Sequence, residues 1–239
     1  MTRTNRHLLS LLLLLPLLAR AAPEPALTVL VYPNPGLFDV GAEGRIEGAG
    51  AELLARLSAA SGVPHDTRAV PAARAQAMLV QLPLHCIFGM SRTAEREPLF
   101  SWVGPLASGE LVLFGRPGEL RQVNGPQDLA GRVVVAQRHS QALAWLVAHG
   151  VTVHEANDLA TGLRMLRAGR VDYWLANELA ARPVIRRLGG EPLQPLLRAG
   201  RVDLYVACHR ELPAALRERL QAGVAQLRRD GELAPFGLR

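Results

Sequence analysis

The sequence contains no lysine, so all 27 of its basic residues are arginine. Arginine stays protonated up to about pH 12, which explains the isoelectric point of about 10.5. The arginines alternate with 21 acidic residues and do not gather in one segment. A nucleic-acid interface needs clustered positive charge. We therefore expect no nucleic-acid partner.

The motifs of common enzyme classes are also missing. The sequence has no P-loop, no G-x-S-x-G, no H-E-x-x-H and no pair of histidines at metal-binding spacing. Its three tryptophans, Trp102, Trp145 and Trp174, are scattered and favour core packing over a sugar-binding platform. The sequence thus predicts no catalytic activity, no cofactor and no metal.

Long apolar runs are missing too, except at the N-terminus. Arg3 and Arg6 precede the apolar run Leu8–Leu18, and Ala19-Arg20-Ala21 follows it. This run is too short to span a bilayer, and the pattern is typical of a secretory signal peptide over residues 1–21. Cleavage after Ala21 would place the mature protein in the periplasm. An uncleaved membrane anchor is the alternative, and no cysteine follows the junction to carry a lipid.

Cysteine is scarce, with only Cys86 and Cys208. An exported protein can form disulfides, but sequence does not set the distance between the two Cα atoms. Neither residue has the spacing of a metal or redox motif. A disulfide and two buried thiols both remain open, and two buried thiols are the simpler expectation.

The stretch Cys86–Pro105 combines an apolar strand with polar side chains. The run Cys86 to Phe88 suits a buried strand, and Gly89 allows close approach of the backbone. Ser91 and Arg96 follow the strand end. Arginine binds a carboxylate through two parallel N–H groups, so these side chains suit a carboxylate site. The alternative is a surface ion pair of Arg96 with Glu95 or Glu97, which contributes little.

The same stretch resembles the family-three bacterial solute-binding proteins, the periplasmic receptors of polar amino-acid ABC importers. Ser91, Thr93 and Arg96 match the pattern Ser-x-Thr-x-x-Arg of that family, and Trp102 and Pro105 match the aromatic and proline that follow. The resemblance covers most of the chain after residue 26. It implies that the serine and arginine hold the carboxylate of a ligand, with Gly89 and Met90 beside them.

Apolar periodicity and turn residues predict an α/β chain. In the first part, strands are expected at 27–32, 65–70 and 86–88, and helices at 49–61 and 71–82. In the second part, strands are expected at 133–136, 151–154 and 171–175, with helices at 140–148, 159–168 and 179–188; a terminal helix follows at 213–229. The repeated R-A-G-R-V-D at 167–172 and 198–203 is interpreted as a turn before a strand.

Two further strands, 110–114 and 204–208, are interpreted as crossovers between lobes. The prediction is a two-lobe periplasmic-binding-protein fold of the type II kind, each lobe a mainly parallel sheet flanked by helices. Residues 22–109 and 205–239 would form lobe 1, and residues 110–204 an inserted lobe 2.

Lobe 2 contributes two candidate contacts. His139, Ser140 and Gln141 open a helix, whose free N–H groups suit an anion; a plain N-cap serine and a surface histidine are the alternatives. Asn177 stands where the family carries an aspartate for the ligand ammonium. Because asparagine is uncharged, a carboxylate ligand without a free amine, or a polar compound, is equally open.

The rim of lobe 1 contributes a third group. The resemblance implies an aromatic stacked on the ligand, and Tyr32 or Phe38 can serve. Arg74 begins a helix near the carboxyl end of the sheet, where α/β proteins bind ligands. Met90 lies beside the strand end, whereas Phe88 is expected in the core.

The predicted function is therefore capture of a small, carboxylate-bearing, amino-acid-like solute by hinge closure, as a monomer, for an ABC permease. Three alternatives remain: a sensory input for a membrane receptor, a protein-interaction module without a small ligand, and a dehydratase-type enzyme. The enzyme would need Glu178, Asp172 or His139 as general acid.

Overall fold

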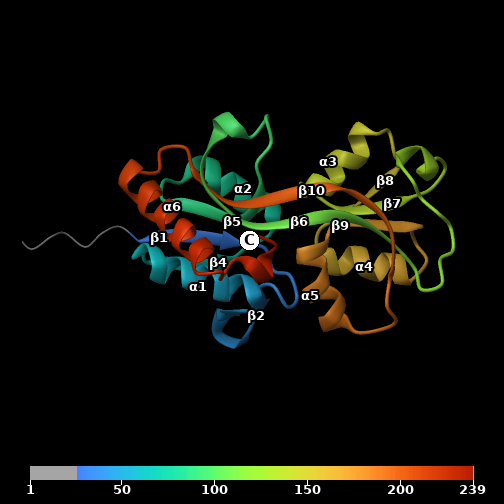
Figure 1. The fold of residues 1–239 in the computed structure, drawn as a ribbon, viewed down its shortest axis with the longest axis horizontal. Coiled ribbons are helices and arrows are strands. Elements are labelled where there is room, and N and C mark those ends of the chain that lie inside the picture. The colour runs from blue at the N-terminus through green and yellow to red at the C-terminus, as the bar shows by residue number, and fades with distance from the viewer. Residues whose placement is uncertain (1–25, 239) are drawn as a thin grey trace, which may run out of the picture.

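A computed structural model of the protein describes residues 26–238. One eight-stranded mixed sheet runs through the molecule in the order β4-β1-β5-β10-β6-β9-β7-β8. Figure 1 shows that two long strands, β6 and β10, join two lobes. We call the half built on β1, β4 and β5 lobe 1 and the half built on β7, β8 and β9 lobe 2. This is the α/β architecture predicted from the sequence.

Lobe 1 places β1 (Leu27–Val31) between β4 (His65–Ala69) and β5 (His85–Ser91), with all three strands parallel. Helix α2 (Ala72–Gln81) covers one face of this sheet, and α1 (Ala49–Ser61) and α6 (Ala214–Arg229) cover the other. The leucines of α1 recur at helical spacing and enter the core. Gly62 ends α1 in the left-handed conformation that glycine favours.

Lobe 2 repeats the arrangement. Strand β7 (Val134–Gln137) lies between β8 (Val153–Ala156) and β9 (Tyr173–Asn177), again with parallel pairing. Helix α3 (Gln141–Ala148) packs on one face, and α4 (Leu159–Arg167) and α5 (Glu178–Leu188) pack on the other. In Figure 1, α3 lies above the sheet and α4 and α5 lie below it.

The crossover strands are longer than the sequence predicted. Strand β6 spans Phe100–Gly115 and β10 spans Gln194–His209, and they pair antiparallel along most of their length. The predicted strands 110–114 and 204–208 are therefore only parts of them. The second R-A-G-R-V-D copy lies within β10, where the register shifts between Arg198 and Arg201. A bulge absorbs the Ala-Gly pair there, so the expected turn does not form.

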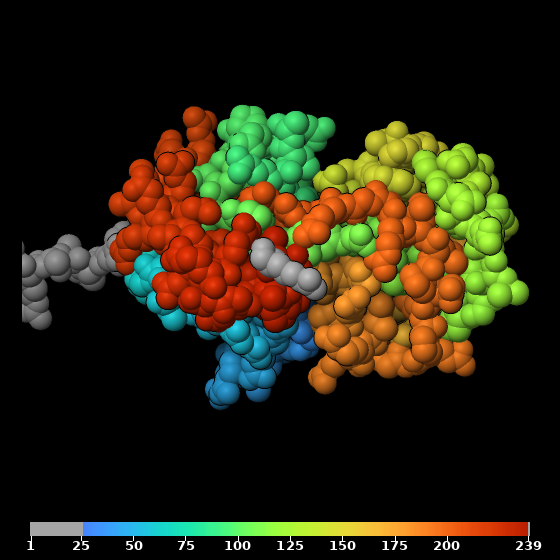
Figure 2. Space-filling model, in the orientation of Figure 1, coloured from blue at the N-terminus to red at the C-terminus, as the bar shows by residue number. Residues whose placement is uncertain are grey.

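The remaining elements are short. Strands β2 (Asp39–Val40) and β3 (Ile46–Glu47) form a small hairpin. Single turns of 3-10 helix occur at η1 (Ala42–Gly44), η2 (Glu97–Leu99), η3 (Pro126–Leu129) and η4 (Ala234–Phe236). Figure 2 shows the C-terminal residues, in red, on lobe 1 beside its junction with lobe 2.

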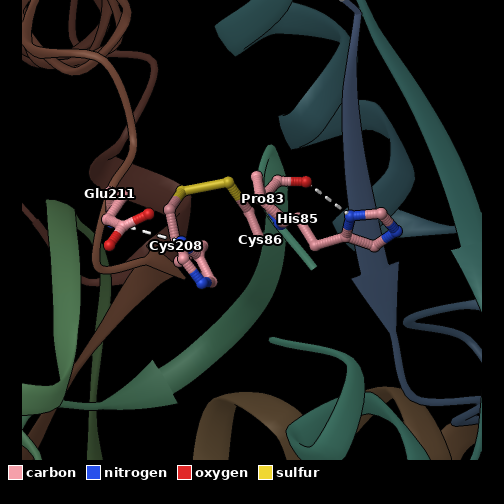
Figure 3. Close-up of a disulfide and its surroundings, with 6 residues drawn as sticks. Pro83, His85, Cys86, Cys208 and Glu211 are labelled. Atoms are coloured by element: carbon pink, nitrogen blue, oxygen red, sulfur yellow. Dashed lines mark hydrogen bonds between the residues drawn. A yellow bond between two sulfur atoms is a disulfide. The ribbon is translucent and has the colours of Figure 1, made fainter. Parts of the chain in front are cut away.

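Cys86 and Cys208 form a disulfide, which corrects the expectation of two buried thiols. Figure 3 shows the bond between β5 and the end of β10. The two residues stand directly opposite each other in the antiparallel β5–β10 pair, and both are fully buried. The pairing of β5 with β10 therefore brings together two cysteines that lie far apart in the sequence.

The predicted signal peptide at residues 1–21 lies outside the described residues. Within 26–238, no helix has the length and apolar character needed to cross a membrane.

Candidate functional site

A cleft of about 470 Å³ lies where the two lobes meet. Residues that follow β1, β5, β7 and β9 line it, and Ala107, Leu111, Val202 and Leu204 of the crossover strands contribute to its wall. Strands β1, β5, β7 and β9 each belong to a parallel pair. The carboxyl ends of parallel strands are where open α/β sheets bind ligands. Nine of the ten predicted site residues line this one cleft.

The side chain of Arg96 bridges the two lobes. Its Nη1 donates to the carbonyl oxygen and the hydroxyl of Ser91, at 3.3 and 3.2 Å, and its Nη2 donates to the carbonyl oxygen of His139 at 3.1 Å. Ser91 is the last residue of β5 and is buried. All three acceptors are neutral, so none of these contacts compensates the positive charge of the guanidinium.

The ion pair considered for Arg96 does not form. Glu97 instead pairs with Arg92, whose guanidinium also lies against the rings of Trp102 and Tyr205. No carboxylate among residues 26–238 makes an ion pair with Arg96. Arg96 is thus a cation without an anionic partner in the described protein.

The segment after β7 combines a helix cap with a strained residue. Ser140 is the N-cap of α3, and its hydroxyl accepts the N–H of Leu143 at 3.2 Å. His139 has φ +61, a left-handed conformation that is uncommon for non-glycine residues. This backbone accompanies the contact of the His139 carbonyl with Arg96. Gln141 begins α3 and lines the cleft beside them.

Asn177 ends β9 and caps α5. Its Oδ1 accepts the N–H of Leu179 at 3.0 Å, which fixes the orientation of the amide. The Nδ2 atom is buried and has no hydrogen-bond partner in residues 26–238. The free hydrogen-bonding group of this cleft-lining residue is therefore a donor, which suits an oxygen of a ligand better than an ammonium.

The three general-acid candidates of the enzyme alternative are dispersed. Burial acts to raise the pKa of Glu178, but a hydrogen bond from Arg182 and the charges of Arg182 and Arg198 together lower it. Glu178 and Asp172 do not line the cleft, and Asp172 accepts the N–H of Val133 at the opposite end of β9. Of the three, His139 alone lines the cleft.

Tyr32 is the aromatic of the rim. It lines the cleft just after β1, and burial raises the pKa of its hydroxyl, although a hydrogen bond with Gln76 and the charge of Arg96 act in the opposite direction. The hydroxyl is therefore neutral at pH 7. Phe38 and Phe88 meet edge to face, with ring centroids 5.4 Å apart; both belong to the core of lobe 1 and both also line the cleft.

Gly89 and Met90 line the cleft, but the structure does not bring Arg74 to it. Arg74 lies on the exposed side of α2, because Ala75 and Leu79 occupy the face of that helix that packs on the sheet.

Sequence reasoning missed several polar residues of the cleft, among them Asn34 and Arg186. Asn34 follows β1 between two prolines and resembles an ordinary turn residue, yet it is only 5% exposed and its Oδ1 has no partner in residues 26–238. Arg186 lies in the last turn of α5, where a basic residue is normal for a helix C-terminus. Its membership of the cleft depends on how α5 packs, which a local pattern does not reveal.

No family model and no curated protein matches this sequence. Solved structures do match its fold. A histidine kinase sensor domain described as similar to periplasmic binding proteins has a TM-score of 0.78 at 21% identity, and covers 89% of this chain and 94% of its own. A mutant of the ArgBP of T. maritima has a TM-score of 0.75 at 18% identity, covering 87% and 92%.

The ligand-binding core of GluR0 from Nostoc punctiforme, solved in complex with L-glutamate, has a TM-score of 0.73 at 18% identity and covers 88% of this chain and 96% of its own. Identities this low show the fold alone. The chain therefore has the two-lobe periplasmic-binding-protein fold that the sequence predicted.

Proposed function

We propose that this chain is an extracytoplasmic binding protein that captures a small carboxylate-bearing solute between its lobes. The observation that supports it most is Arg96, a cation in the cleft whose acceptors, on Ser91 and His139, are all neutral. A ligand carboxylate that receives a charge-assisted hydrogen bond from a guanidinium gains roughly twice the strength of a neutral one. The cleft also has the size of a small-molecule site.

The proposal includes where the protein acts and how it is built. The signal peptide 1–21 would export it to the periplasm, with the mature chain starting at Ala22. We keep the boundaries proposed for lobe 1, at 22–109 and 205–239, and for lobe 2, at 110–204; they fall within β6 and β10. Closure of the lobes around the ligand would bury it, and a monomer suffices for this.

A membrane protein would then recognise the closed form. An ABC permease is the first candidate partner, since a putative L-cystine ABC transporter from Listeria monocytogenes shares the fold. A sensory receptor is the second, because the fold also matches a histidine kinase sensor domain. With either partner, the same ligand would bind in the same cleft.

Thermal shift measurements on the mature protein test this function. The panel consists of amino acids, organic acids and small peptides. A ligand at about one hundred times its Kd adds about 2.7 kcal/mol of stability. We expect at least one carboxylate to stabilise the protein, and Arg96→Ala to remove that effect while leaving the unliganded melting temperature nearly unchanged.

Arg92→Ala is the matched control. Arg92 lies four positions away, is exposed and does not line the cleft. If carboxylate binding survives Arg96→Ala, Arg96 is not the carboxylate-binding residue. The assignment also fails if Arg92→Ala removes binding to the same extent. The absence of any response to carboxylates would instead support an interaction module.

A further inference from the structure

The charges that line the cleft are strongly unbalanced. Five arginines and one glutamate contribute to its wall: Arg56, Arg96, Arg138, Arg182, Arg186 and Glu52. Glu52 is exposed on the first turn of α1. A cleft with this excess of positive charge raises the local concentration of anions and disfavours cations. The pairing of each arginine then decides how many are free to bind a ligand.

Three of the five arginines already have carboxylate partners outside the cleft wall. Arg56 pairs with Glu232 at 3.2 Å, Arg138 with Glu155 at 2.9 Å, and Arg182 with Glu178 at 2.6 Å. Their charges are largely compensated within the protein.

The other two arginines, Arg96 and Arg186, have no anionic partner among residues 26–238. Arg96 donates to neutral oxygens only. Arg186 makes no hydrogen bond or ion pair through its side chain in the described protein. Arg96 belongs to lobe 1 and Arg186 to lobe 2, so the cleft presents one uncompensated cation from each side.

Arg186 lies on the face of α5 that borders the cleft. Leu179, Ala180, Arg182 and Pro183 of the same helix also line the cavity, and Arg186 follows Arg182 and Pro183 at the spacings of one helical turn. Arg187, the next residue, does not line the cavity. The orientation of the helix therefore brings one of the two neighbouring arginines to the cleft.

From these contacts we propose that the ligand is a small dicarboxylate, with one carboxylate bound by Arg96 and the other by Arg186. This deepens the proposed function and depends on it. Two carboxylates would compensate the two remaining cations, one in each lobe, so that binding itself would join the lobes. Arg186 lies in the last turn of α5, where the helix dipole disfavours anions. A singly charged carboxylate is repelled less there than a doubly charged phosphate.

Calorimetry on the mature protein tests the proposal. The ligands are the α,ω-dicarboxylates from succinate to suberate, each compared with its own monoamide, which has the same shape and one charge fewer. We expect at least one dicarboxylate to bind ten times more tightly than its monoamide. Arg186→Gln should remove that difference without weakening the monoamide, whereas Arg96→Gln should weaken both ligands.

The control variant is Arg187→Gln, which makes the same change on the same helix outside the cleft and should leave both affinities unaltered. If no dicarboxylate binds better than its monoamide while Arg96-dependent binding of other carboxylates persists, the second-carboxylate site is wrong and the proposed function stands. If no carboxylate of any kind binds, both fail. If Arg187→Gln and Arg186→Gln reduced the affinity for the dicarboxylate equally, the proposal would also be overturned. That result would mean that the positive charge of the region, and not a contact with Arg186, favours the second carboxylate.

Discussion

The two polar atoms of the Asn177 side chain have different roles. Its Oδ1 caps α5, and its Nδ2 is buried without a partner in the described protein. An aspartate would keep the cap, because a carboxylate oxygen accepts the same N–H and is favoured at a helix N-terminus. The change would replace a donor by a negative charge at a site bordering the cleft.

We therefore expect Asn177→Asp to raise affinity for free α-amino acids by about tenfold or more, since a hydrogen bond to a charged group contributes roughly 1.5–3 kcal/mol. Stability should be unchanged or slightly higher. Titration of amino acids by calorimetry measures the gain. The same variant should bind dicarboxylates more weakly, because the new charge repels them.

Asn177→Ala separates the two roles. It should cost about 1 kcal/mol of folding stability through the lost cap and give no gain for amino acids. An equal gain from both variants would show that removal of the amide, rather than the new charge, matters.

Residues of the cleft were predictable where a local pattern carries the reason. Ser91 ends a strand and Arg96 follows it, and Ser140 opens a helix, so sequence alone indicates their position. Asn34 and Arg186 gave no such signal, because burial and the packing of α5 bring them to the cleft. Arg74 shows the opposite error. It lies near a strand end in the sequence and was therefore predicted in the site, but it lies on the outer face of its helix.

The elements show the same division between local and long-range causes. Helices α1 and α6 were predicted closely because their apolar spacing is local. Strands β6 and β10 were predicted too short, since Gly104, Pro105 and the Ala199-Gly200 pair resemble breaks. Pairing between the two strands continues past these residues through register shifts. That compensation comes from a partner strand far away in the sequence, which no local window contains.

The disulfide joins two such elements, β5 of the early chain and β10 of the return, and closes a loop with a sequence separation of 122 residues. A cross-link of that span removes much conformational freedom from the unfolded chain, and loss of a native disulfide typically costs about 2–5 kcal/mol. We expect the double variant Cys86→Ala/Cys208→Ala to melt roughly 5–15 °C lower, at about 2–4 °C per kcal/mol for a chain of this size.

Calorimetric melting of the variant and of the parent protein, with and without reductant, measures this effect. Reductant should lower the parent's melting temperature toward that of the variant and leave the variant unchanged. A parent that melts at the same temperature with its thiols fully reduced would contradict the prediction.

At the scale of the whole molecule, contacts between lobes lie on several sides of the cleft. Arg96 of lobe 1 reaches His139 of lobe 2. Arg201 of β10 donates to the carbonyl oxygen of Gly237 at 2.9 Å, which ties the C-terminal segment to the crossover strand. Pro235 and Phe236 of that segment line the cleft. The loop after β1 approaches α5 at Gly36 and Pro183.

The approach at Gly36 is close enough to test closure directly. Gly36 has φ +79, and a Cβ there would lie 2.9 Å from the Cβ of Pro183 and 3.0 Å from its carbonyl oxygen. Gly44 has nearly the same conformation, φ +77, but a Cβ there meets nothing within 4 Å. The same substitution at the two positions therefore adds the same backbone strain, and only the change at Gly36 separates the lobes.

We expect Gly36→Ala and Gly44→Ala to lose similar stability, about 1 kcal/mol. Ligand affinity should fall at least tenfold in Gly36→Ala alone, and the ligand-dependent decrease in radius of gyration, measured by small-angle X-ray scattering, should shrink in that variant. Because the two glycines share their backbone strain, a difference in closure can only come from the contact with Pro183. Equal affinities in the two variants would mean that binding does not require the lobes to meet at this point.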